Sequence, residues 1–283
     1  MYKTILALGT NEWFEFSQKE QIALFKECGF DGFFVNWTEE MNIKEIKEYA
    51  DSIGMIFQSI HAPSPITPDM WTKGENAEKA VAVLLKCVRD CAENDVPIMV
   101  CHAITGFDKY TPNIFGVENF GIVIEEAKKL GVKVAIENLE GEAYTKALFD
   151  VFGNFENVGF CWDTGHEMCY SQGDMMELYG EKIICTHLND NLGPNDFDGE
   201  RAAEDDMHLL PFDGIADWED IVSKLNRYGY DGILTFELKK NTKYDGLSHE
   251  VYKKMTVREY VCEAHKRACK IAAMKLRNKN IYI

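Results

Sequence analysis

Apolar residues along the chain follow two alternating patterns. One is a short continuous apolar run, typical of a parallel strand buried on both faces. The other is an apolar stripe with helical spacing, as at Ala77, Ala80, Val81, Leu84, Leu85 and Val88. The runs predict strands over approximately residues 3–9, 30–36, 55–61, 96–102, 133–138, 158–163, 183–188 and 232–238. The intervening helices are predicted over approximately residues 17–28, 42–53, 75–94, 117–130, 144–151, 174–179 and 217–228, with a last helix over 249–276.

Glycine marks the change from helix to strand at four places, in residues 26–36, 50–61, 128–137 and 226–237. A glycine after a helix takes the left-handed conformation that closes the last turn. Eight units of strand followed by helix predict an α/β protein with a single (β/α)8 TIM barrel domain over residues 1–283. A doubly wound nucleotide-binding sheet is disfavoured, because no Gly-x-Gly-x-x-Gly follows a strand.

Composition supports a cytoplasmic protein of this size. The 283 residues suit a barrel, which typically needs about 250. No run of about 18 apolar residues occurs, so we expect no membrane-spanning helix, and the apolar stretch after Met1 is too short for a signal peptide. Nine cysteines without a Cys-x-x-Cys pair predict buried free thiols in a reducing cytoplasm.

The net charge of −17 restricts the class of partner. A strongly acidic surface repels polyanions, and the longest basic features are pairs such as Lys128-Lys129. Proteins that bind duplex DNA normally present a basic stripe to the phosphates. We therefore expect a small-molecule substrate and no nucleic-acid partner, and the sequence leaves open whether the chain forms a homo-oligomer.

Ionisable residues end most of the predicted strands. The carboxyl ends of barrel strands converge on one mouth, where the active sites of this fold lie. Four consecutive strands end in Glu137, Asp163, His187 and Glu237. Three carboxylates and one imidazole are suitable ligands for a single divalent ion, Mn²⁺, Mg²⁺, Co²⁺ or Zn²⁺. The alternative, four separate ion pairs with lysines, needs cations that these strands do not supply.

Aromatic residues in the predicted loops are candidates for the walls of a pocket. The loop over residues 62–74 contains Trp71, and Trp13 and Trp37 follow the first two strands. Long loops on one barrel face usually shape a site. These indoles either contact substrate, as we expect for Trp13 and Trp71, or cap the barrel core.

Five segments resemble the xylose isomerase-like barrels, a superfamily of sugar and sugar-phosphate isomerases and epimerases and of abasic-site endonucleases. They are AIENLEG (135–141), DTGH (163–166), HLNDN (187–191), DMHLLPFDGIADW (206–218) and GYDGILTFE (229–237). The resemblance spans the whole length, with each motif on the expected strand in the expected order. Its ketose 3-epimerase branch implies that Glu137, Asp163, His187 and Glu237 bind one metal ion. It also implies that the two glutamates are the acid–base pair and that His166 contacts substrate.

The expected chemistry can also be argued from the residues themselves. A divalent ion polarises the carbonyl of a bound ketose and acidifies the neighbouring carbon–hydrogen bond. Glu137 and Glu237, on opposite sides of the substrate, would remove and return a proton through an enediolate. Return to the same carbon gives an epimer, and return to the next carbon gives an isomer. The chain departs from the epimerase pattern at Gly193, where those enzymes usually have an arginine, and Arg201 is the candidate substitute.

Five further residues complete the nine-ligand pattern of the endonuclease branch: His61, His102, His166, Asp206 and His208. That resemblance implies a second metal ion at His61 and His102, which share the glutamate, and a third at the other three. Three interpretations remain open: the five residues hold sugar hydroxyls, bind further metal ions, or are structural.

The sequence therefore predicts a metal-dependent isomerase or epimerase of a small sugar or sugar phosphate. The alternatives are a phosphodiesterase of the abasic-endonuclease type, a polyol dehydratase and a non-catalytic sugar-binding protein. One metal ion per chain favours the first function, and three zinc ions favour the endonuclease. A binding protein would not need the paired glutamates.

Overall fold

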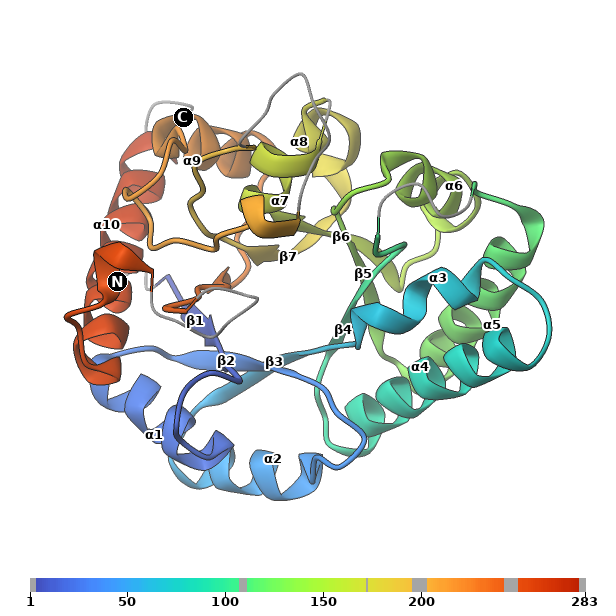
Figure 1. Cartoon of the computed structure of the whole chain (residues 1–283), viewed down its shortest axis with the longest axis horizontal. Coiled ribbons are helices and arrows are strands. Elements are labelled where there is room, and N and C mark those ends of the chain that lie inside the picture. Colours follow the sequence, from blue (N-terminus) through green and yellow to red (C-terminus); the bar gives the residue numbers. More distant parts are fainter. Residues whose placement is uncertain (1–3, 107–110, 172, 195–202, 242–248, 280–283) are drawn as a thin grey trace.

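The architecture is a ring of eight parallel strands surrounded by helices (Figure 1). The computed structural model describes residues 4–106, 111–171, 173–194, 203–241 and 249–279. Its strands are β1 Leu6–Gly9, β2 Gly32–Asn36, β3 Ile56–His61, β4 Ile98–His102, β5 Lys133–Glu137, β6 Val158–Asp163, β7 Ile183–His187 and β8 Leu234–Phe236. Neighbouring strands are parallel, in the order β7-β6-β5-β4-β3-β2-β1-β8.

The two ends of this order meet and nearly close the barrel. Leu188, next to β7, forms a parallel bridge with Phe236 of β8. The Leu188 amide donates to the Thr235 carbonyl at 2.8 Å, and the Glu237 amide donates to the Leu188 carbonyl at 3.3 Å. The predicted (β/α)8 barrel is confirmed, and all eight predicted strands are present, β6 with the predicted bounds and the other seven with shorter ones.

Eight of the helices correspond to the predicted ones. They are α1 Gln18–Cys28, α2 Ile43–Ser52, α4 Glu75–Glu93, α5 Ile114–Leu130, α6 Glu142–Phe152, α8 Met175–Tyr179, α9 Trp218–Arg227 and α10 Val257–Lys279. Gly29 after α1 and Gly131 after α5 have φ angles of 111° and 74°, the left-handed conformation expected at these junctions. Two short helices were not predicted, α3 Thr67–Met70 and α7 Thr164–Tyr170.

The last helix begins eight residues later than predicted, at Val257 instead of residue 249. The reason is a capping arrangement at Thr256. Its hydroxyl accepts from the Glu259 amide at 3.2 Å, and the Glu259 carboxylate accepts from the Thr256 amide at 2.8 Å. His249 therefore precedes the helix, with Nε2 3.1 Å from the Met207 carbonyl oxygen.

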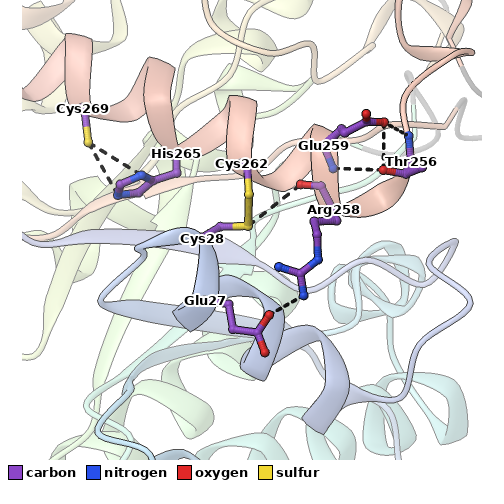
Figure 2. Close-up of a disulfide and its surroundings, with 8 residues drawn as sticks. All are labelled: Glu27, Cys28, Thr256, Arg258, Glu259, Cys262, His265 and Cys269. Atoms are coloured by element: carbon purple, nitrogen blue, oxygen red, sulfur yellow. Dashed lines mark hydrogen bonds and ion pairs between the residues drawn. A yellow bond between two sulfur atoms is a disulfide. The ribbon is translucent and has the colours of Figure 1, made fainter.

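Two cysteines form a disulfide, which corrects the prediction that all nine are free. Cys28 in α1 and Cys262 in α10 are bonded across a separation of 234 residues (Figure 2). Closure of the barrel packs the first helix against the last one and brings these thiols together. Six other cysteines are free and buried, and Cys269 is free and exposed. Within the described part of the chain, no helix has the length and apolar character needed to cross a membrane.

Candidate metal centre

The strand ends bring the predicted ionisable residues to one mouth. His61, His102, Glu137, Asp163 and His187 are the last residues of β3, β4, β5, β6 and β7. Glu237 directly follows β8. All six residues are buried, and Glu137, Asp163 and His187 are completely inaccessible to solvent. The common register of the parallel strands produces this convergence.

Glu137 is the centre of the arrangement. Its Oε2 lies 3.0 Å from His61 Nε2 and 3.3 Å from His102 Nε2. Its Oε1 lies 3.1 Å from His187 Nδ1. The same His187 nitrogen lies 3.0 Å from Glu237 Oε2, so one imidazole stands between the two glutamates that we expect to act as bases.

The donor atoms fall into overlapping groups that fit a divalent cation. Donors of His61, Glu137, His187 and Glu237 lie within 4.8 Å of one another. Asp163 forms a neighbouring group with His208 and Glu237, so the predicted quartet is spread over two adjacent groups. His102 Nε2 and Glu237 Oε2 are buried, and their contacts with Glu137 and His187 are too poorly directed to be hydrogen bonds, so both atoms are available to a cation. Oxygen and imidazole donors of this kind suit the four ions named above.

The remaining predicted residues extend this cluster. Asp206 Oδ2 lies 2.8 Å from His208 Nε2 and 3.4 Å from His166 Nε2. His166 Nδ1 lies 3.4 Å from Glu137 Oε1, and His208 Nδ1 lies 3.2 Å from the Glu237 carbonyl oxygen. All nine residues therefore occupy one continuous site, and their ligand roles remain predictions.

Asp163 is held in place by neighbours that the sequence analysis did not single out. Asn189 Nδ2 donates to both carboxylate oxygens, at 3.1 and 3.0 Å. Asp163 also caps α7, since Oδ1 accepts from the His166 amide at 2.8 Å. Behind it, Asn138 exchanges two hydrogen bonds of 2.8 Å with the Asp163 backbone.

Gly165 is required by the close approach of Asn189. A Cβ atom at Gly165 would lie 1.9 Å from Asn189 Oδ1. Thr164 completes this contact, because its hydroxyl donates to the Asn189 carbonyl at 2.7 Å and accepts from the Asn189 amide at 3.0 Å. The DTGH and HLNDN motifs thus interlock at the ends of β6 and β7.

Asp190 anchors the segment that carries Asp206 and His208. Its backbone pairs with Leu209 in an antiparallel bridge. Its buried carboxylate accepts from the amides of Asn191, Phe212 and Ala216 and from Trp218 Nε1, at 2.8 to 3.0 Å. The sequence signal for the role of Asp190 was its place in the polar pair Asn189-Asp190, directly after the predicted strand over residues 183–188.

The charges in the cluster stabilise one another. Burial opposes ionisation of Glu137, yet the imidazoles of His187 and His102 hold its pKa well below the usual range. Burial likewise opposes the charged form of His166, and Asp163 and Asp206 outweigh it and raise the His166 pKa. Burial dominates at Asp163, whose pKa is raised, and at His102, whose pKa is lowered to about 4. Closely packed opposite charges are characteristic of functional sites.

A pocket of about 390 Å³ opens onto this cluster. Its lining includes His61, His102, His166 and His208, together with Trp37, whose Nε1 donates to Asp90 at 2.7 Å. Trp37 therefore forms a fixed wall.

Two of the three predicted substrate contacts, Trp71 and Trp13, do not line this pocket. Trp71 is 2% exposed, packs on Gly116 and donates to the Ala103 carbonyl, so it fills the interior instead of lining the pocket. Trp13 is 39% exposed and is not part of the lining. Arg201 lies outside the described residues.

Comparison with known proteins supports the fold described above. A family model described as xylose isomerase-like TIM barrel matches residues 22–255. An uncharacterized protein of Sinorhizobium fredii is 25% identical, over 80% of this chain and 82% of its own length. Another, from Methanocaldococcus jannaschii, is also 25% identical, over 88% of each chain.

Solved structures show the same fold at low identity. An L-ribulose 3-epimerase superposes with a TM-score of 0.76, 15% identity and coverage of 99% and 98% of the two chains. The D-psicose 3-epimerase of Clostridium cellulolyticum, solved with D-tagatose, gives 0.74, 15%, 96% and 99%. The IolI protein, solved with a zinc atom, gives 0.72, 17%, 93% and 97%.

Proposed function

Because the chain belongs to the xylose isomerase-like TIM barrel family, we propose that it is a metal-dependent enzyme that isomerises or epimerises a small sugar or sugar derivative. The observation that carries this proposal is the placement of Glu137 and Glu237. Their carboxylates lie 3.1 and 3.0 Å from the same nitrogen of His187, and Glu237 also lines the pocket. Two carboxylates facing one small site can serve as a paired acid and base. The solved epimerases with this fold add support.

Glu137, His187 and Glu237 would hold the metal ion, with Asp163 or His61 as the further ligand. Such an ion would polarise the carbonyl of the substrate. Asn189 keeps Asp163 turned toward the site. Burial of all these groups keeps bulk water away from the reacting atoms.

The two glutamates carry the proton transfer. One takes the proton from the carbon beside the carbonyl, and the other returns a proton from the opposite side or to the next carbon. His61, His102, His166 and His208 line the pocket, and we propose that they, with Asp206, hold substrate hydroxyls. A single domain and a cytoplasmic location remain predictions.

Solvent exchange tests the mechanism. Purified protein supplied with Mn²⁺ is screened against ketoses and their phosphates in deuterated water, and products are analysed by NMR. We expect deuterium on the carbon beside the carbonyl. Glu137→Gln and Glu237→Gln should abolish turnover, while Glu48→Gln on the exposed face of α2 should leave it unchanged. Conversion without any exchange would contradict a two-base transfer and favour a hydride shift.

A second function is favoured by one observation, the convergence of all nine residues of the endonuclease pattern. His166, Asp206 and His208 form their own group of donors within 4.8 Å. Elemental analysis distinguishes the functions. One metal ion per chain supports sugar chemistry, or a polyol dehydratase if water is lost. Three zinc ions together with incision of abasic DNA would establish the endonuclease, against which the net charge of −17 argues.

A further inference from the structure

Two cysteines lie side by side in the barrel, next to the metal centre. The register of β6 and β7 pairs Cys161 with Cys185. Two residues further along the same strands, Asp163 is paired with His187. Residues two apart on a strand share a face, so the two thiols form the next layer below these residues, toward the amino ends of the strands. Both cysteines are completely buried and free, and neither has a part in the proposed function.

A hydrogen bond from Gln58 places the Cys185 sulfur inside the barrel. Gln58 belongs to β3, on the opposite side of the ring from β7, and its Nε2 donates to Cys185 Sγ at 3.7 Å. A contact between opposite strands crosses the interior of the barrel. Thr235 of β8 donates to Gln58 Oε1 and so fixes the direction of the amide. An oriented N–H donor at a sulfur is the kind of support that metal-binding cysteines receive.

His187 offers a third donor to the same position. One of its ring nitrogens and the two thiol sulfurs lie within 4.8 Å of one another. Nδ1 already lies between the two glutamates, at 3.1 and 3.0 Å, whereas Nε2 is buried and makes no hydrogen bond with the described residues. Phe34 stacks on the imidazole with ring centroids 4.6 Å apart, which holds the ring in this orientation. A completely buried polar nitrogen without a hydrogen bond calls for a ligand.

From these contacts we propose that Cys161, Cys185 and His187 Nε2 bind a second and softer metal ion, Zn²⁺, in the layer below the metal centre. Thiolate and imidazole donors favour zinc over Mn²⁺ and Mg²⁺. Each thiol releases its proton to solvent when the ion binds. Two thiolates balance the charge of one Zn²⁺, so the occupied site is neutral in its apolar surroundings, which include Val100 and Ala135. His187 then joins the two ions through its two nitrogens.

A thiolate-bound ion adds one to the metal content expected for the proposed function. Two ions per chain, of which one depends on the cysteines, therefore remain compatible with sugar chemistry. The ion held by the carboxylates does not need the thiols, so the proposed function stands or fails separately.

Cobalt serves as the probe, because Co²⁺ bound to thiolate gives a sulfur-to-cobalt absorption in the near ultraviolet that oxygen and imidazole ligands do not give. The full chain is produced in medium supplemented with Co²⁺, so that the ion can enter before the site is buried, and no thiol is added during purification. The background is Cys269→Ser, because the exposed Cys269 sulfur lies 3.5 Å from His265 Nε2 and could bind cobalt itself. We expect this protein to show the absorption.

Alanine variants in the same background locate the ion. Cys161→Ala and Cys185→Ala should each lose the absorption and about one cobalt ion per chain by elemental analysis. Cys101→Ala, which removes a buried thiol of β4 outside this group, is the control and should keep both. Circular dichroism checks that each variant is folded. Absorption that survives in folded Cys185→Ala would assign the cobalt to other thiols and overturn the proposal.

X-ray absorption at the cobalt edge needs no cysteine variant at the site. The Cys269→Ser protein should show sulfur neighbours of cobalt at about 2.3 Å. If cobalt has only nitrogen and oxygen neighbours, the two cysteines are ordinary buried thiols of the core, and the proposal is wrong while the carboxylate-bound ion remains.

Discussion

Asn189 is the residue on which the position of Asp163 depends most. Its amide donates to both oxygens of the Asp163 carboxylate, and burial raises the pKa of that carboxylate. Loss of a partner behind a metal ligand typically costs 10- to 100-fold in metal affinity. We expect Asn189→Ala to weaken Mn²⁺ binding by about that factor, measured by calorimetry. Asn226→Ala, which removes a hydrogen bond to the Lys275 carbonyl between α9 and α10, is the control. Unchanged Mn²⁺ affinity in Asn189→Ala would show that Asp163 is not a ligand.

Gly165 allows a second test of the same contact without removing any polar group. The Cβ of Gly165→Ala would meet Asn189 Oδ1 at 1.9 Å and displace that side chain. We expect a loss of about 1–3 kcal/mol in the free energy of unfolding, measured in urea, together with weaker Mn²⁺ binding. Gly173→Ala has no atom within 4 Å of its new Cβ and should match the wild type. Equal behaviour of the two variants would contradict the contact.

At the scale of residues, the strand-end side chains could be predicted because alternation and register fix where they point. Trp71 could not, because its place depends on Gly116, 45 positions later, whose missing side chain makes room for the indole. The roles of Asn189 and Asp190 also arise from contacts between separate loops. No local pattern in the sequence encodes such contacts.

The loop after β7 depends on Asp190, which accepts four hydrogen bonds in a buried position. Asp190→Asn replaces one accepting oxygen by an amide that can only donate. At least one buried donor then loses its partner, which costs about 2–4 kcal/mol in the free energy of unfolding. Urea denaturation should show this loss, and Asp51→Asn on the exposed face of α2 should stay within about 0.5 kcal/mol of the wild type. A neutral Asp190→Asn would mean that the loop is held by other contacts.

Helix α7 contains a pH-sensitive group, Glu167. Burial raises its pKa to about 7, although its bond from Trp162 opposes the shift. Between about pH 4.5 and 7 the folded protein keeps a proton that the unfolded chain has lost, so stability falls as pH rises through this window. Glu167→Gln should therefore be more stable than the wild type at pH 8, by about 1–3 kcal/mol, and similar to it at pH 4. Thermal unfolding at both pH values checks this, and a pH-independent difference would contradict it.

Long periodic elements were predictable, and short ones were not. Helix α4 displays a complete apolar stripe, whereas α7 and α3 have too few residues to show a period. The start of α10 was encoded in the sequence after all, as the Thr-x-x-Glu capping pattern at residues 256–259. The predicted start at residue 249 extended the helix through a turn that contains only a short 3₁₀ segment, Glu250–Tyr252.

At the scale of the whole molecule, the Cys28–Cys262 bond joins the first and last helices of the barrel. Its loop spans most of the chain, so it restricts the unfolded state strongly. Removing a disulfide typically costs about 2–5 kcal/mol. We expect Cys262→Ser to lower the free energy of unfolding by that amount under non-reducing conditions, with Mn²⁺ affinity unchanged. Dithiothreitol should reproduce the loss in the wild type and have no effect on the variant. Cys269→Ser, which removes an exposed free thiol, is the control.

The position of β8 between β7 and β1 has a consequence for how the protein is made. Leu6 of β1 pairs with Leu234 of β8, so the barrel cannot close until β8 has emerged from the ribosome. Such distant pairing is a slow step in folding. Glu237 directly follows β8 and joins the site only when the barrel closes, whereas Glu137 and His187 are synthesised earlier. A nascent chain would therefore carry an incomplete set of these side chains until β8 has been made.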